Sequence, residues 1–212
     1  MSYIGSKPAN KPVVASDLDP AVITGQTALA VAPADTDEFL ISDAGVLKRL
    51  DASLVGGGGI TEADIWRLTA NISSGTNADI TANLERSDTA NYGLLGSGMT
   101  QSSGIFTFPS TGMWQILVQT TYFYNNQADN VGNVQTNISA DGSSYVTHTE
   151  TAGGEGNGGG GSTYSTFSQC LIDVTNASNF RAKFTTASLG GTVQGSTSKN
   201  MTSFSFIRLG DT

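Results

Sequence analysis

The sequence predicts an all-β fold, an antiparallel sandwich or jelly roll preceded by an extended N-terminal arm. Composition is the first reason: only 13% of the residues are charged, about half the usual share, while Gly, Ser, Thr and Asn are abundant. Such a composition suits short strands and polar turns better than helices. The second reason is that short apolar runs, separated by turn residues and with no helical stretch between them, continue from Ile65 to the C-terminus.

The chain divides at a composition break, Gly56 to Gly59. Before the break lie four of the five prolines and few apolar residues, whereas the aromatic residues concentrate after it. A length of 212 residues suits one β domain plus an extension. We therefore predict an arm over residues 1–55, a Gly-rich linker over 56–64 and a head domain over 65–212.

Two local elements are expected in the arm. The segment "SDLDPAVITG" favours a short helix from Pro20, with Asp17 or Asp19 near its N-terminus. The segment "DEFLISDAGVLKRLD" predicts a β-hairpin that turns at residues 43–45. Because an arm of this size cannot close its own core, we expect its apolar side chains to anchor it to another protein: Phe39, Ile41, Val46, Leu47 and Leu50.

The head should contain seven to ten short strands. The longest run, residues 113–126, alternates so that Trp114, Tyr122 and Tyr124 share one face, and both faces carry apolar groups. A hairpin with Asp141-Gly142 at its tip is expected over 133–150. The remaining strands are predicted at 65–70, 104–109, 165–174, 179–187 and 201–210.

Charge and chain composition exclude several classes of partner. The net charge is −8, and Lys48-Arg49 is the only adjacent pair of cations, so the sequence offers no patch for nucleic acid. No apolar run approaches the ~20 residues that span a bilayer, and the start lacks the apolar core of a signal peptide, so we expect no membrane insertion. The single cysteine, Cys170, lies in an apolar run and is expected to be buried rather than reactive.

Catalysis and metal binding find little support. His148 is the only histidine, and the sequence contains no nucleophile elbow with which it could form a catalytic triad. One His and one Cys are too few ligands for a zinc site. We therefore expect no catalytic residues, metal or cofactor. Paired carboxylates could hydrolyse a polysaccharide. The candidates are Glu62, Asp64, Asp129, Asp141, Glu150 and Glu155. Asp141 is better explained by its turn, Glu62 and Asp64 by the linker, and Glu155 by the loop.

One segment of the head resembles a known family. "GIFTFPSTGMWQI" is similar to the strand–turn–strand signature of the complement-q globular head and its tumour-necrosis-factor relatives, with Gly104, Phe106, Pro109 and Gly112 matching and Trp114 in place of the usual Tyr. The closing "SFSFIRLGD" is similar to the last core strand of that family. The resemblance covers roughly residues 65 to 211. It implies a jelly roll that assembles as a homotrimer around an aromatic-rich axis.

The arm resembles proteins of a different kind. "TDEFLISDAGVLKRLDASLV" and the "MSYIG" start are similar to adaptor units in tail-fibre and other virion proteins of bacteriophages. Together the two resemblances imply a non-enzymatic virion protein, made in the host cytoplasm, whose arm binds other virion proteins. We expect a trimeric tail fibre that binds a host surface receptor or glycan. The alternatives are a capsid decoration or head-fibre protein and a polysaccharide-degrading spike enzyme.

The aromatic residues are the main candidates for contacts. On strands, spacing of two favours the core or a subunit interface over a ligand platform, and this applies to Phe106, Phe108, Trp114, Tyr122, Tyr124, Phe204 and Phe206. Two further aromatics, Tyr145 and Tyr164, flank variable loops and are the candidates for ligand contact. The loops expected to recognise a glycan are residues 125–132 and 151–162.

Overall fold

The structure is a computed structural model that describes residues 19, 21–25, 27, 29–31, 33–34, 36–55, 59–125, 130–155 and 161–212, without the side chains of residues 22, 23, 130 and 155. It divides into two compact units, Met1–Gly57 and Gly58–Thr212, which correspond to the arm and the head.

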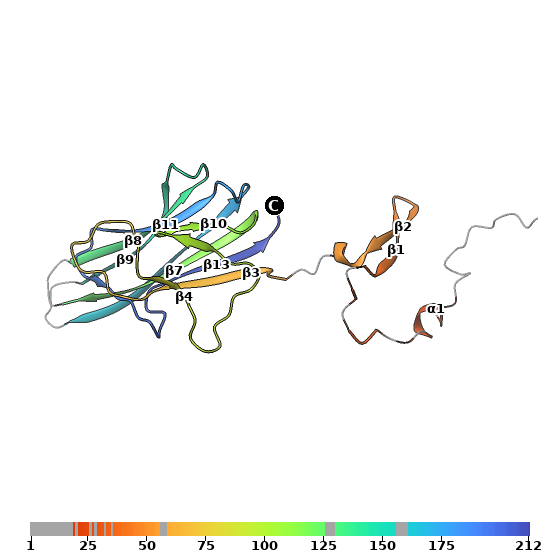
Figure 1. Cartoon of the computed structure of the whole chain (residues 1–212), viewed down its shortest axis with the longest axis horizontal. Helices are drawn as coiled ribbons and strands as arrows, with labels where there is room; N and C mark the ends of the chain where they lie inside the picture. Colours follow the sequence, from red (N-terminus) through yellow and green to blue (C-terminus); the bar gives the residue numbers. More distant parts are fainter. Residues whose placement is uncertain are drawn as a thin grey trace, which may run out of the picture. The chain divides into compact units, whose positions relative to one another are not determined.

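The head consists of two antiparallel sheets (Figure 1). The first, here called the β7 sheet, has the order β10-β7-β13-β3-β4, with β12 also paired to β7; the second, the β8 sheet, has the order β5-β6-β11-β8-β9. Their strands are β3 (Glu62–Leu68), β4 (Leu84–Arg86), β5 (Thr100–Ser102), β6 (Ile105–Thr107), β7 (Gly112–Tyr124), β8 (Asn130–Ser139), β9 (Val146–Glu155), β10 (Ser162–Val174), β11 (Arg181–Ala187), β12 (Thr192–Val193) and β13 (Ser203–Gly210).

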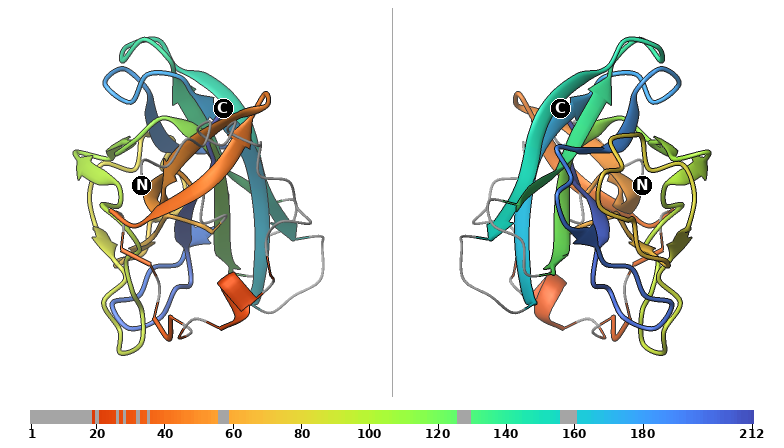
Figure 2. Two further views of the ribbon diagram at one scale, coloured as in Figure 1. Left: turned by 90° about the vertical axis from the view of Figure 1, so that its right-hand side faces the viewer. Right: turned by 90° about the vertical axis from the view of Figure 1, so that its left-hand side faces the viewer.

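The two sheets pack face to face around an aromatic core (Figure 2). Phe184 of the β8 sheet stacks on Phe204 of the β7 sheet with ring centroids 4.0 Å apart, and Phe106 lies 5.2 Å from Phe206. All seven aromatic residues expected in the core or at a trimer contact are at most 2% exposed: Phe106, Phe108, Trp114, Tyr122, Tyr124, Phe204 and Phe206. They therefore fill the core of one chain, which removes them as contacts between chains.

The long strands follow the sequence expectation, and of the strands of two or three residues only β6 does. β7 pairs with β10 and β13, and the 133–150 hairpin forms as β8 and β9 with Asp141-Gly142 in the turn. The first strand begins at Glu62, so residues 62–64 belong to the head and not to the linker. β4, β5 and β12 were not predicted, because each has only two or three residues and shows no period.

Two glycines of the family-like segment are required by their surroundings. Gly104 has φ +80°, and a Cβ there would lie 2.1 Å from the carbonyl oxygen of Ile80. Gly112 has φ +128°, and its Cβ would lie 2.4 Å from the carbonyl oxygen of Gly210. Residues with a side chain disfavour this backbone region. Glycine is therefore required at both positions, before β6 and at the start of β7.

The arm contains the helix and hairpin expected from the sequence. The helical turn α1 (Ala21–Thr24) starts beside Asp19, whose Oδ1 accepts a hydrogen bond from the amide of Ala21 at 2.9 Å. The hairpin comprises β1 (Glu38–Asp43) and β2 (Val46–Asp51) and is followed by the 3-10 turn η2 (Ala52–Leu54). None of the helices in the described ranges is long and apolar enough to cross a membrane.

The hairpin register sorts the predicted anchoring residues by face. Phe39 pairs with Leu50, and Val46 pairs with Asp43, so Phe39, Ile41, Val46 and Leu50 lie on one face. Leu47 pairs with Ser42 and lies on the opposite face. The side chains of Phe39 and Val46 are 42% and 58% exposed. Within the described part of the arm these two apolar side chains are left uncovered.

Candidate binding surface on the outer face of the β7 sheet

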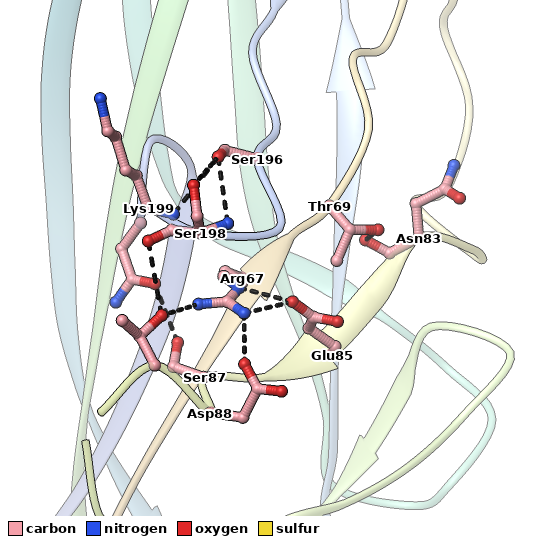
Figure 3. Close-up of polar contacts among 11 residues, drawn as sticks. Arg67, Thr69, Asn83, Glu85, Ser87, Asp88, Ser196, Ser198 and Lys199 are labelled. Atoms are coloured by element: carbon pink, nitrogen blue, oxygen red, sulfur yellow. Dashed lines mark hydrogen bonds and ion pairs between the residues drawn. The ribbon is translucent and has the colours of Figure 1, made fainter. Parts of the chain in front are cut away.

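A buried arginine organises one edge of the β7 sheet (Figure 3). Arg67 lies on β3 and is 1% exposed, and its guanidinium donates to Glu85 Oε1 at 2.6 Å, Thr89 Oγ1 at 2.7 Å and Asp88 Oδ1 at 2.5 Å. Burial on its own lowers the pKa of Arg67, but the hydrogen bonds and negative charges of Glu85 and Asp88 outweigh it and raise that pKa. The arginine thus stays charged and ties the segment after β4 to the sheet.

The same network holds a second segment, the turn at residues 196–200. Ser87 Oγ donates to Asn200 Oδ1 at 2.9 Å, and Gln119 Nε2 donates to the Asn200 carbonyl at 3.1 Å. Within the turn, Ser196 Oγ accepts from the amides of Ser198 and Lys199, both at 3.2 Å (Figure 3). Two segments more than 100 residues apart in sequence are therefore held against one sheet.

These two segments wall a hollow of about 580 Å³, here called the loop groove. Its floor is the outer face of the sheet, and its walls carry one aromatic ring and one cation. The lining residues are Ile65, Leu117, Gln119, Ser203 and Ser205 on the floor, and Thr89, Tyr92, Ser198, Lys199 and Asn200 on the walls. Because hydrogen bonds already fix both walls, the groove is preorganised to receive a side chain or ligand.

Next to the loop groove the outer face is almost uncharged and carries apolar side chains among uncharged polar ones. Alternation along β3, β7, β10 and β13 leaves Arg67 and Asp173 as the only charged residues on this face of the four strands, and Arg67 is buried. Phe167, on the edge strand β10, is 76% exposed and pairs with Gln119 of the groove floor. A large apolar side chain exposed on an edge strand is typical of a contact surface.

Two acids of β3 are engaged in structure. Asp64 was assigned to the linker, and this is wrong: it lies on β3, is 4% exposed and accepts from Arg86 Nε, Trp66 Nε1 and the Met99 amide, each at 2.9 Å. Glu62 Oε1 accepts from Ser110 Oγ at 2.6 Å. Burial of this part of β3 explains why both acids need partners within the head.

The turn and strand-surface acids are also accounted for, in separate places. Asp141 accepts from the amides of Ser143 at 2.8 Å and Ser144 at 2.7 Å, and these hydrogen bonds hold the pKa of its carboxyl far below the usual value. Glu150 Oε2 accepts from Asn133 Nδ2 at 3.2 Å. Asp129 and the side chain of Glu155 lie outside the described residues.

The two tyrosines proposed for ligand contact do not share a site. The ring of Tyr145 lies under Lys183 Nζ at 4.4 Å, and the ring of Tyr164, which is 41% exposed, lies 6.1 Å from that of Tyr124. A hydrogen bond between Thr149 and Ser168 marks where β9 and β10 pass each other. Tyr145 and Tyr164 lie on opposite sides of that point, toward the two ends of the sandwich.

The loops expected to recognise a glycan are only partly loops. Residues 130–132 belong to β8 and residues 151–155 to β9, while 126–129 and 156–160 lie outside the described residues.

His148 is exposed, with Nδ1 at 3.0 Å from the Val146 carbonyl oxygen, and burial raises the pKa of the Cys170 thiol. The described residues contain no group of three or more His, Cys, Asp or Glu side chains placed to hold a metal ion.

Sequence reasoning missed the residues that shape this surface. Tyr92 and Lys199 lie in segments without hydrophobic periodicity. Only the folded structure, with its Arg67 network, shows that both line the loop groove. Phe167 could have been found, because it is out of phase with Cys170, Ile172 and the other inward positions of β10. The available signal was an apolar residue at an outward-facing position of an edge strand.

No family model and no curated protein matches this chain. Solved structures do match it. Eiger TNF from S. frugiperda superimposes with a TM-score of 0.54 at 13% sequence identity, covering 73% of this chain and 96% of that one. Murine APRIL, in its crystal structure at pH 8.5, has a TM-score of 0.50 at 10% identity, covering 70% and 98%. At such identities the similarity concerns the fold, and it confirms that the head is a jelly roll like that of these TNF proteins.

Proposed function

We propose that the protein is a non-enzymatic, homotrimeric tail fibre of a bacteriophage virion, whose jelly-roll head binds a receptor or glycan on the host surface. The observation that carries the proposal is the outer face of the β7 sheet, where Phe167 is 76% exposed beside the loop groove. This face is not used by the core of its own chain. Its composition suits contact with a second protein surface.

The layout of this face favours a ring over a pair. Phe167 protrudes from the edge strand β10, whereas the loop groove lies on β3, β7 and β13. A contact that seats Phe167 of one copy in the groove of the next joins two different patches, and such a contact closes into a ring when the rotation between copies permits it. The family resemblance of "GIFTFPSTGMWQI" supports three copies in the ring. Ile65 and Leu117 would supply the apolar floor for the phenyl ring.

The carboxylates support binding over hydrolysis. A glycosidase needs one acid that can hold a proton and a second acid facing it across the substrate. Here Asp64 is neutralised by Arg86, and hydrogen bonds to Asp141 favour its ionised form. The assignment to a virion has its support in the resemblance of the arm to phage adaptor segments and in the exposed face of its hairpin.

Light scattering tests the assembly. We expect three times the chain mass for the full chain and for a chain that begins at Gly59. Phe167→Ser should reduce both to monomers, because it removes the largest exposed apolar group of the contact. Val131→Ser, at a residue of β8 that is 53% exposed, is the matched control and should leave the trimer intact. A monomeric parent chain, or a trimer that survives Phe167→Ser, would contradict the proposed contact.

A further inference from the structure

A second hollow, here called the end cavity, lies where the turn after β8 meets the end of β10. It has a volume of about 400 Å³, within the range of small-ligand pockets. None of its lining residues belongs to the loop groove. The β8–β9 hairpin and the end of β10 approach each other here, so the cavity is formed by segments more than 20 residues apart.

The floor of the end cavity is hydrocarbon. Ile138, Ile172 and Phe180 are 4%, 6% and 9% exposed, and all three belong to the core of the head. The floor is therefore rigid, since these side chains are packed from behind by the sandwich. An apolar surface that faces a hollow, and not another side chain, favours a ligand with an apolar face.

The rim of the end cavity is polar and negative. It carries Asp141, Ser144, His148 and Asp173, and its lining includes neither lysine nor arginine. Oδ1 of Asp141 accepts the hydrogen bonds of the turn, and the Ser144 side chain also interacts with this carboxylate. The side chain of Asp173 has no ion-pair or hydrogen-bond partner in the part of the chain that the structure describes. Two carboxylates thus face a hollow without a cation to balance them.

We propose that the end cavity binds an amino sugar, a pyranose that carries an ammonium group. The C–H face of the ring would lie on Ile138, Ile172 and Phe180, and the ammonium group would bind between Asp141 and Asp173. Ser144 and His148 would hydrogen-bond to ring hydroxyls. The inference rests on the proposed function, because it names the class of host glycan that the head recognises.

The number of polar groups on the rim favours a sugar over a protein ligand. A lysine side chain has an aliphatic stem and one ammonium group, so it would pair with the carboxylates and make no use of Ser144 Oγ or His148 Nε2. A pyranose brings several hydroxyls around an apolar face and can satisfy all four groups. An acidic sugar would place its carboxylate against two others, which is unfavourable.

Binding of defined probes to the intact protein tests the proposal. Four probes would be titrated and followed by calorimetry and ligand-observed NMR: glucosamine, N-acetylglucosamine, glucuronic acid and Nα-acetyl-lysine amide. We expect glucosamine to bind, N-acetylglucosamine to bind at least tenfold more weakly and glucuronic acid not to bind. Asp173→Asn should weaken glucosamine binding at least tenfold, because it removes one of the two unpaired carboxylates. Glu150→Gln, the same charge change at an exposed site elsewhere on the head, should have no effect.

Each contrary result has a separate meaning. Equal binding of the three sugars, no binding of glucosamine, or full binding by Asp173→Asn would overturn the amino-sugar site. Tighter binding of the lysine derivative than of glucosamine would overturn the sugar in favour of a protein ligand. Light scattering on the same samples distinguishes failure of the binding site from failure of the proposed assembly. A trimer that does not bind glucosamine refutes only the site, and a monomer that binds glucosamine refutes only the trimer.

Discussion

Asp64 and Arg67 are two charged residues on one short strand, and both are buried. On the sequence alone Asp64 precedes the apolar pattern "IWRL", Arg67 interrupts it, and both suggest exposure. Their partners, Arg86 for Asp64 and Glu85 with Asp88 for Arg67, come from β4 and the residues just after it. Because β4 has three residues and no period, no local pattern predicts that it pairs with β3 and neutralises these charges. The error in assigning Asp64 to the linker has this cause.

Asp64→Asn should lower the free energy of unfolding by about 3 kcal/mol, because it breaks a buried ion pair and leaves Arg86 without its carboxylate. Urea unfolding of the chain that begins at Gly59 measures the change. Asp79→Asn is the matched control: Asp79 is bonded to Lys183 at 2.8 Å, but its side chain is 42% exposed. Such an exposed pair contributes about 1 kcal/mol or less. Equal effects of the two substitutions would show that the Asp64 cluster is not held as described.

At the scale of elements, long alternating strands were predictable and the walls of the loop groove were not. The run from Met113 to Tyr124 alternates over 12 residues, and this places Trp114 and Tyr122 in the core without any knowledge of partners. The groove needs β3, β7 and β13 to lie side by side, and this order is a non-local property of the sheet. Its walls follow from hydrogen bonds to single residues such as Asn200, which leave no period in the sequence.

The β5–β6 turn offers a test of the element packing. Gly104→Ala should destabilise the head by about 3 kcal/mol, because a positive φ and a clash with the Ile80 carbonyl oxygen act together. Gly75→Ala is the control, since Gly75 has φ +83° but nothing within 4 Å of its Cβ position. It should cost about 1 kcal/mol from the backbone alone. Thermal and urea unfolding compare the two, and a Gly104→Ala effect no larger than that of Gly75→Ala would contradict the close approach of Ile80.

The whole molecule consists of a head with a hydrophobic core and an arm whose described residues contribute none to that core. The jelly roll of the head was predictable because strand number, spacing and the "GIFTFPSTGMWQI" segment all indicate it, and the TNF structures confirm that fold. The arm was predictable as a hairpin, from the alternation of Phe39 and Ile41 and the turn at Ala44-Gly45. A two-stranded hairpin is marginally stable by itself, and the sequence does not identify what the apolar face of this one contacts.

Removal of residues 1–55 tests the role of this arm. We expect the shortened protein to keep the melting temperature and the oligomeric state of the head, because the two units are compact separately. Incorporation into virus particles should be lost, since the face with Phe39, Ile41, Val46 and Leu50 goes with the arm. Phe39→Ser with Val46→Ser in the full chain should reproduce this loss while leaving the head intact. Leu40→Ser, at a residue of the opposite face that is 75% exposed, is the control. If the shortened protein still assembles into particles, attachment occurs through the head and the arm is not the anchor.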